Sequence, residues 1–193
     1  MKDEPVYIVS TSFHRSGSSM MMRCLEGGGM KLLKDTLLDG PWNGSGVAGY
    51  VPNPNGFYNG PDEQADWPSF CDDARGKLVK LFRLSLPMLL PGKYRLIFMV
   101  RDPAEILASI RAWTPHRSWG RLETDLHFLP QIKEALYAQL RGRGDFDILE
   151  VNYNDVMKNP LKEFERIKEF GFPIDPAAAA ALVDPALYRN RLV

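Results

Sequence analysis

The segment that begins at Val6 constrains the fold more than any other part of the chain. The apolar run Val6 to Val9 is followed by a polar segment from Ser12 to Ser19 and then by an apolar-striped segment that continues to about Glu26. This order predicts a buried strand, a tight turn and a helix whose first N–H groups lack partners within the helix. Such N–H groups and the helix dipole bind anions, and Arg15 adds a bidentate donor suited to phosphate or sulfate. A solvated turn with Ser16 as the helix N-cap is the simpler alternative.

The turn differs from the loop of nucleoside triphosphatases. When the pattern G-x-x-x-x-G-K-[ST] is laid over residues 12 to 19, Gly17 is kept, but Ser12 replaces the first glycine and Ser18 replaces the lysine. The basic residue lies earlier, at Arg15. No acidic residue at the end of a second predicted strand suggests a Mg²⁺ ligand. We therefore expect the turn to hold an anionic group without a dedicated metal.

The rest of the chain alternates between apolar runs and helical segments. Strands are predicted at 78–84, 95–100 and 146–151, and helices at 62–73, after Pro103, at 122–140 with an interruption near Pro130, and after Asn159 and Asp175. Continuous apolar runs are typical of parallel strands that are covered on both faces. The pattern predicts an α/β fold, a three-layer P-loop-type domain with a mostly parallel four- to five-stranded sheet flanked by helices. We expect the first strand to be central.

Length and composition favour one domain, over residues 1–193. Within it, Gly, Pro and Asn dominate residues 40–61, a segment too long for a plain connector. Four aromatic residues also lie there, namely Trp42, Tyr50, Phe57 and Tyr58. Aromatic residues are scarce in disordered segments, so we interpret this one as a lid or acceptor-binding loop rather than as a disordered surface loop.

Charge and cysteine content narrow the classes of partner. The chain has 24 Lys and Arg residues and 24 Asp and Glu residues, which argues against a binder of nucleic acid or of membrane surfaces. No apolar stretch approaches the length of a membrane span, and the polar start, Lys2 to Glu4, is unlike a signal peptide. Cys24 and Cys71 are expected to be free thiols in a reducing compartment. We therefore expect a cytoplasmic protein.

Four segments resemble the sulfotransferase superfamily, whose members use 3′-phosphoadenosine 5′-phosphosulfate (PAPS). His14 to Ser19 resembles the loop that holds the 5′-phosphosulfate. Ile97 to Pro103, followed by Ser109, resembles the 3′-phosphate motif. Asn53 to Tyr58 and the stretch from Tyr153 to Gly171 are similar to two further family segments. The four occur in the family's order over nearly the whole chain.

The resemblance implies a reaction and a donor site. The expected reaction transfers a sulfuryl group from PAPS to a hydroxyl or amine acceptor and releases adenosine 3′,5′-bisphosphate (PAP), with no metal ion. Arg101 also stands out independently, as a cation at the end of an apolar strand, where α/β sheets bind ligands. Helix capping accounts for Asp102 and Glu105. The donor-site residues implied are His14, Arg15, Ser16, Gly17, Ser18, Ser19, Arg101 and Ser109.

The acceptor side departs from the family pattern. The family's catalytic histidine falls on Phe82 or Ser85, and Asn59 stands where bacterial relatives often have Glu. We rank Glu63 first and His116 second as the catalytic base, and Asp62, Asp66 and His127 are further candidates. Lys80 is expected either to reach the sulfuryl group or to extend toward solvent at a sheet edge. Arg15, Lys80, Glu63 and His116 are thus the catalytic candidates.

Two other functions remain open. The missing histidine also suits a module that binds PAP or PAPS without catalysis. An ATP-dependent kinase with a degenerate loop is a further alternative, although the absent lysine argues against it.

Overall fold

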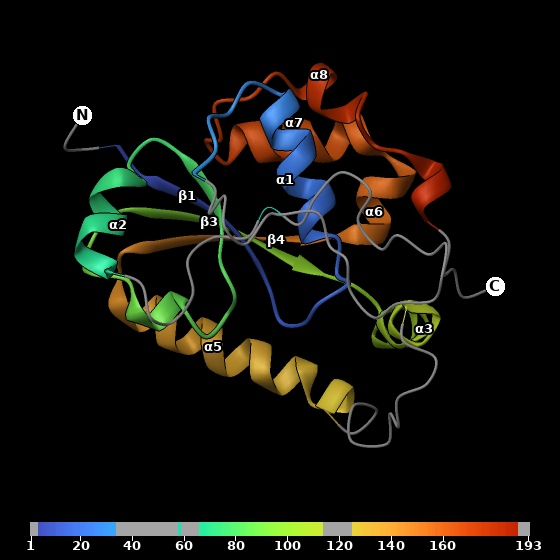
Figure 1. The fold of residues 1–193 in the computed structure, drawn as a ribbon, viewed down its shortest axis with the longest axis horizontal. Coiled ribbons are helices and arrows are strands. Elements are labelled where there is room, and N and C mark those ends of the chain that lie inside the picture. The colour runs from blue at the N-terminus through green and yellow to red at the C-terminus, as the bar shows by residue number, and fades with distance from the viewer. Residues whose placement is uncertain (1–3, 34–57, 59–65, 114–124, 189–193) are drawn as a thin grey trace.

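A computed structural model describes residues 4–33, 58, 66–113 and 125–188. Among these residues, four strands form one parallel sheet in the order β2-β1-β3-β4 (Figure 1). The strands are β1 (Val6–Thr11), β2 (Leu78–Lys80), β3 (Tyr94–Val100) and β4 (Phe146–Asn152). The parallel sheet and the central position of its first strand are as predicted.

Helices cover both faces of the sheet (Figure 1). On one face lie α1 (Ser18–Gly27), α6 (Tyr153–Lys158), α7 (Pro160–Glu169) and α8 (Pro176–Ala180). On the other lie α2 (Trp67–Asp73) and α5 (Leu129–Arg143), while α3 (Pro103–Trp113) follows β3. Short 3₁₀ turns occur at η1 (Leu86–Met88) and η2 (Pro185–Leu187). This arrangement confirms the three-layer α/β fold.

The central strand contributes to two separate cores because its side chains alternate between the faces. Tyr7 and Val9 belong to the cluster that includes residues of α1 and α7. Val6 and Ile8 belong to the cluster that includes residues of α2 and α5. All six residues of β1 are buried, which explains why its sequence is a continuous apolar run rather than an alternating one.

Helix starts follow the predicted signals, with one exception. Asp102 accepts a hydrogen bond from the Ala104 N–H at 2.7 Å, and Asp175 accepts from two N–H groups of α8. Pro130 lies in the first turn of α5, and residues 125–127 form a separate helical turn before it. Asn159 precedes α7 but makes no capping hydrogen bond with its side chain, so that detail of the prediction was wrong.

The predicted strand 78–84 is shorter in the structure, because β2 ends at Lys80. The Leu81 N–H still donates to the Val9 carbonyl at 3.1 Å, and the chain then turns, with the Ser85 N–H donating to Phe82. Phe82 is 43% exposed and Leu84 is 58% exposed. On its other side β2 is bridged to Leu32 at Leu78, and the turn closed by the Ser85–Phe82 hydrogen bond ends the strand although the sequence remains largely apolar.

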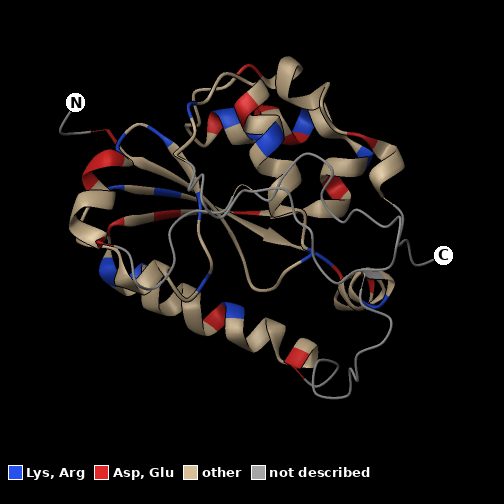
Figure 2. Ribbon diagram, in the orientation of Figure 1, with Lys and Arg blue, Asp and Glu red and all other residues tan. Residues whose placement is uncertain are grey.

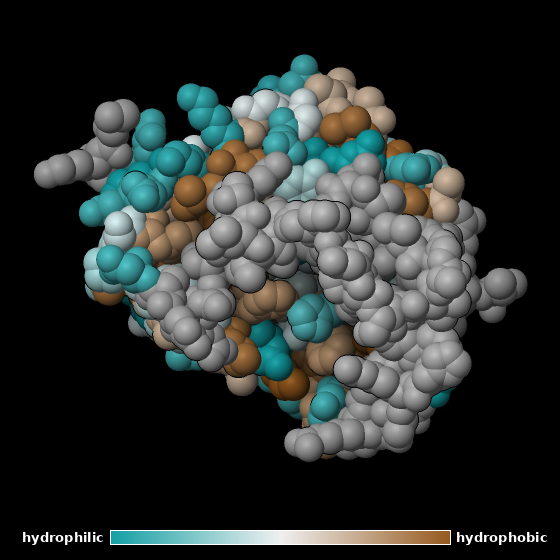
Figure 3. Space-filling model, in the orientation of Figure 1, coloured by the Kyte–Doolittle hydropathy of each residue, from teal (hydrophilic) through white to brown (hydrophobic). Residues whose placement is uncertain are grey.

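Cys24 and Cys71 are both buried free thiols. Burial raises the pKa of the Cys24 thiol to about 12. None of the helices in the described part of the chain is long and apolar enough to cross a membrane. Basic and acidic residues lie side by side on α7 (Figure 2), and polar and apolar surface mix on the described part of the face in Figure 3.

Candidate functional site

Residues from all four strands converge at the carboxyl edge of the sheet. Lys80 is the last residue of β2, and the loop of residues 12–17 follows β1. Arg101 directly follows β3, and Tyr153 directly follows β4. Ligands of open parallel sheets bind at this edge, because the loops after successive strands meet there.

The loop of residues 12–17 is held by hydrogen bonds at its start. The Thr11 hydroxyl lies 3.0 Å from the Met99 carbonyl and 3.1 Å from the Phe13 carbonyl, which ties the end of β1 to β3. The buried Ser16 hydroxyl donates to the Phe13 carbonyl at 2.8 Å. Ser16 is therefore not the helix N-cap. Gly17 takes that position, with φ of 90° and no capping side chain.

Gly17 is required at its position for two reasons. Its positive φ is one that side chains disfavour. In addition, a Cβ atom there would lie only 2.3 Å from Cδ2 of Tyr153. The segment after β4 therefore packs directly against the start of α1.

Arg15 joins the loop to α3. Its Nε donates to the Ser109 hydroxyl at 3.1 Å, and its backbone adopts φ of 69°, which is unusual for a residue other than glycine. Ser109 itself is buried. Two residues assigned from the sequence to opposite ends of a nucleotide are thus in direct contact.

Arg101 lies in a closed cage. Its Nε donates to the Glu105 carboxylate at 2.9 Å, and its Nη1 donates to the Arg15 carbonyl at 3.0 Å. The guanidinium carbon lies 4.4 Å from the centre of the Tyr153 ring. The side chains of Arg101 and Glu105 are 6% and 4% exposed, so this ion pair is buried.

Glu105 organises the cage from α3. Its second carboxylate oxygen accepts from the Tyr188 hydroxyl at 2.7 Å and from Asn154 Nδ2 at 3.3 Å. Burial opposes the charge of Glu105, but the hydrogen bonds from Tyr188 and Arg101 outweigh it and lower the pKa of the carboxyl. Glu105 is therefore a partner of Arg101 rather than only a capping residue. The Asn154 side-chain oxygen is buried and has no hydrogen-bond partner among the described residues.

A second cluster of cations lies on the β2 side of the loop. The Lys80 ammonium is buried and donates to the Ser19 hydroxyl, in the first turn of α1, at 3.2 Å. Arg83 Nε donates to the Ser12 carbonyl at 2.8 Å. Partial burial lowers the pKa of His14, and the charges of Lys80, Arg15 and Arg83 lower it further.

Most of the predicted acceptor-side residues lie outside the described part of the chain. This is so for Glu63, Asp62 and His116, and for the loop 40–61 except Tyr58, which is buried in the core beside α1. Asp66 caps α2 by accepting from the Ser69 N–H at 3.5 Å. His127 is exposed and packs edge-on against Phe128.

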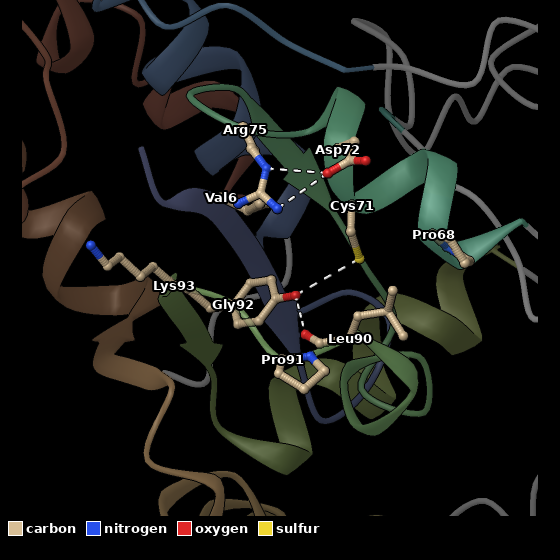
Figure 4. A pocket seen from close by; sticks show the side chains of 10 residues that line it. Val6, Pro68, Cys71, Asp72, Arg75, Leu90, Pro91, Gly92 and Lys93 are labelled. Carbon is tan, nitrogen blue, oxygen red and sulfur yellow. Dashed lines mark hydrogen bonds and ion pairs between the residues drawn. The ribbon is translucent and has the colours of Figure 1, made fainter. Parts of the chain in front are cut away.

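A small cavity of about 120 Å³ lies at the opposite edge of the sheet (Figure 4). It is lined by the first residues of β1 and β3, Val6 and Tyr94, and by Cys71 and Arg75 from the α2 region. The Tyr94 hydroxyl donates to the Leu90 carbonyl and lies 3.8 Å from the Cys71 sulfur. None of the site residues predicted from the sequence lines this cavity.

Sequence reasoning missed Arg83 and the role of Glu105 as partner of Arg101. Arg83 was hidden within an apolar run that was expected to be a buried strand. Glu105 fits a local capping pattern, and that pattern gave no reason to look for a distant partner. Tyr153 had a usable signal, because it directly follows a strand, as Arg101 does.

No family model matches the chain, and a search of curated proteins finds no match to its sequence. Support for a function therefore comes from the residues of the site.

Proposed function

We propose that the carboxyl edge of the sheet binds PAPS and that the protein transfers its sulfuryl group to a hydroxyl or amine acceptor, releasing PAP. One observation carries the proposal: Arg15 lies in the loop that leads into α1, and Lys80, at the end of β2, donates to Ser19 in the first turn of α1, so both cations lie close to His14 of that loop. The pKa of His14 is lowered first by burial and then by the charges of Lys80, Arg15 and Arg83, and this group of cations is further support. A positive site at a helix N-terminus favours a multiply charged anion.

The residues of this cluster suit the phosphosulfate. Arg15 offers a planar fork of donors, and Lys80 offers a compact charge beside the Ser19 hydroxyl. The N–H groups of residues 16–19 and the Ser18 hydroxyl belong to the same turn. Sulfuryl transfer spreads negative charge over several oxygens, so these groups act mainly by positioning and electrostatic stabilisation.

Arg101 and Ser109 are the proposed contacts of the 3′-phosphate, under one condition. Arg101 is already paired with Glu105, so a phosphate must compete with that carboxylate for the guanidinium. The buried Asn154 oxygen beside the cage accepts no described hydrogen bond, and a nucleotide brings hydroxyl and amino donors. The donor set thus fits a nucleotide that carries more than one anionic group.

Calorimetric titration with PAP, and separately with Mg²⁺–ATP, tests the proposal. We expect PAP to bind and Mg²⁺–ATP to bind at least about tenfold more weakly, a difference of about 1.4 kcal/mol. Arg15→Gln should weaken PAP binding by about tenfold or more, because it removes a charge-assisted contact. Arg75→Gln is the matched control, since Arg75 pairs with exposed Asp72 at the opposite edge (Figure 4).

The outcomes separate the three candidate functions. Absence of PAP binding contradicts the sulfotransferase proposal and also the non-catalytic PAP module. PAP binding without release of PAP from PAPS, across a panel of phenols, alcohols and amines, favours the module. Tighter binding of Mg²⁺–ATP than of PAP favours the kinase.

A further inference from the structure

The His14 imidazole lies where the loop of residues 12–17 meets the turn after β2. Its ring centre is 5.8 Å from that of Phe13 and 5.1 Å from that of Phe82, and both contacts are edge-to-face. Part of the His14 side chain is nevertheless exposed to solvent. The ring is therefore oriented by its neighbours and remains reachable by a second substrate.

Cations approach His14 from each element packed against it. Arg15 comes from the same loop, Lys80 from the end of β2 and Arg83 from the following turn. Lys80 is held by the Ser19 hydroxyl, and Arg83 is held by the Ser12 carbonyl. Burial lowers the pKa of His14, and a proton there would also add a fourth positive charge beside these cations, so the lowered pKa favours the neutral imidazole near pH 7.

A neutral imidazole contributes little to anion binding beside these cations. It does offer an unprotonated ring nitrogen, which accepts a proton. The Phe82 ring beside it is 43% exposed and offers an apolar surface to an acceptor. His14 thus combines a free base with an accessible surface beside the proposed sulfuryl site.

We infer that His14 is the general base that deprotonates the acceptor. The inference rests on the proposed function. The acceptor oxygen or nitrogen forms a bond to sulfur while the bond between sulfur and the oxygen of the 5′-phosphate breaks, and the electron pair of that bond stays on the phosphate. The acceptor's proton passes to the His14 ring nitrogen and then to water. This assigns to His14 the role that the sequence suggested for Glu63 or His116.

The first measurement separates a base from a phosphate ligand. His14→Gln keeps hydrogen-bonding capacity but removes the basic nitrogen, and His127→Gln is the matched histidine control. For a base, the dissociation constant of PAP in His14→Gln should stay within about threefold of the wild-type value. A rise of about tenfold or more identifies His14 as a ligand of the nucleotide instead and overturns the inference.

The second measurement is the titration of the histidine ring protons by NMR. The chain has three histidines, and the signal absent from His14→Gln belongs to His14. We expect its pKa below the ordinary value of 6.5, and we expect it to rise when PAP binds, because an anion stabilises the imidazolium. A pKa at or above 6.5 without PAP overturns the inference.

The third measurement is the release of PAP from PAPS with 2-naphthol or water as acceptor, from about pH 5.5 to about pH 9. We expect the wild-type rate to fall on the acid side as His14 protonates, and His14→Gln to lose about 100-fold in rate together with this acid limb. Added imidazole should partly restore the rate of PAP release by His14→Ala.

An unchanged rate or acid limb in His14→Gln, or a wild type that binds PAP without releasing it from PAPS, overturns the inference. A wild type that does not bind PAP contradicts the proposed function instead.

Discussion

Arg101 and Lys80 lie at the ends of the two strands on either side of β1, yet the structure holds these two cations differently. Arg101 is bonded to a buried carboxylate and a carbonyl and is covered by an aromatic ring. Lys80 is bonded to a serine hydroxyl and shares its surroundings with Arg15, Arg83 and His14, whose pKa is lowered.

The difference separates two uses of positive charge. In the Arg101 cage, Glu105 supplies the negative charge, so the pair stabilises one arrangement of the loop and α3. Lys80, Arg15 and Arg83 instead place three positive charges near His14, and a bound anion would interact favourably with all three. The first region should therefore respond to mutation in stability and the second in binding.

The largest effect is expected from breaking the Arg101 cage. Glu105→Leu should lower the free energy of unfolding by about 3–5 kcal/mol, because it leaves the buried Arg101 charge without its carboxylate. The double variant Arg101→Met with Glu105→Leu should recover much of this loss, because no unpaired charge remains. Urea denaturation measures both. If the free energy of unfolding of Glu105→Leu lies within about 1 kcal/mol of the wild-type value, the Arg101 cage is not a source of stability.

Glu105→Gln adds a pH test to the same cage. The pKa of Glu105 is lowered in the folded state, so its stabilisation is present above the ordinary value of 4.5 and is lost as the pH falls through the folded-state pKa. The variant should start less stable at neutral pH and lose less stability on acidification. Denaturation midpoints at neutral and acidic pH, compared with the wild type, provide the measurement.

The next effect concerns Gly17, where the cage region meets the loop. In Gly17→Ala, the new side chain must adopt a disfavoured positive φ, and its Cβ atom clashes with the Tyr153 ring. The variant should lower the free energy of unfolding by about 2–4 kcal/mol. Gly144→Ala is the matched control, since Gly144 has φ of 72° and no atom near its Cβ position. It should cost only about 1–2 kcal/mol. If urea denaturation shows equal losses of stability for Gly17→Ala and Gly144→Ala, the clash with Tyr153 does not contribute.

Lys80→Met tests the binding region. Loss of a charge-assisted contact should raise the dissociation constant of PAP by about ten- to hundredfold. Stability should be unchanged or higher, because the variant removes a buried charge from a cationic cluster. Lys77→Met, just before the start of the same strand, is the control and should leave PAP affinity unchanged. If Lys80→Met and Lys77→Met bind PAP with similar affinity, Lys80 does not contribute to PAP binding.

The smallest effect is the pH dependence that His14 adds to stability. Its pKa is lowered in the folded state, so the unfolded chain binds this proton first as the pH falls below neutrality. The wild type should therefore lose stability between about pH 7 and about pH 5.5, and His14→Gln should lose less. Urea midpoints at the two pH values measure this. A steeper loss in His14→Gln is inconsistent with a neutral imidazole in the folded protein.

The sequence predicted the elements that local patterns control. The apolar runs that form β1 and β3 are covered on both faces of the sheet. Their sequences are therefore continuously apolar rather than alternating, and the strands could be predicted. Asp102 and Asp175 cap helices because capping depends on residues a few positions apart. Arg101 was assigned to the candidate site from its place at a strand end, and it does follow β3 directly.

The errors occur where distant residues decide the outcome. Phe82 and Leu84 follow a strand in the sequence, but the turn at the sheet edge exposes them. Glu105 fits a local cap, while its partners Asn154 and Tyr188 come from far along the chain. The roles of Lys80 and Arg83 depend on a loop about 70 residues earlier in the sequence, so periodicity does not reveal them.

The contact of Tyr153 with Gly17 has a consequence for how the protein is made. During synthesis, the loop after β1 leaves the ribosome long before Tyr153, and Tyr188 follows later still. A nascent chain that has not reached β4 lacks the ring that packs on Gly17 and the hydroxyl that holds Glu105. At that stage Arg101 therefore lacks part of its surroundings, and the PAP binding that we propose should appear only after the last strand has joined the sheet.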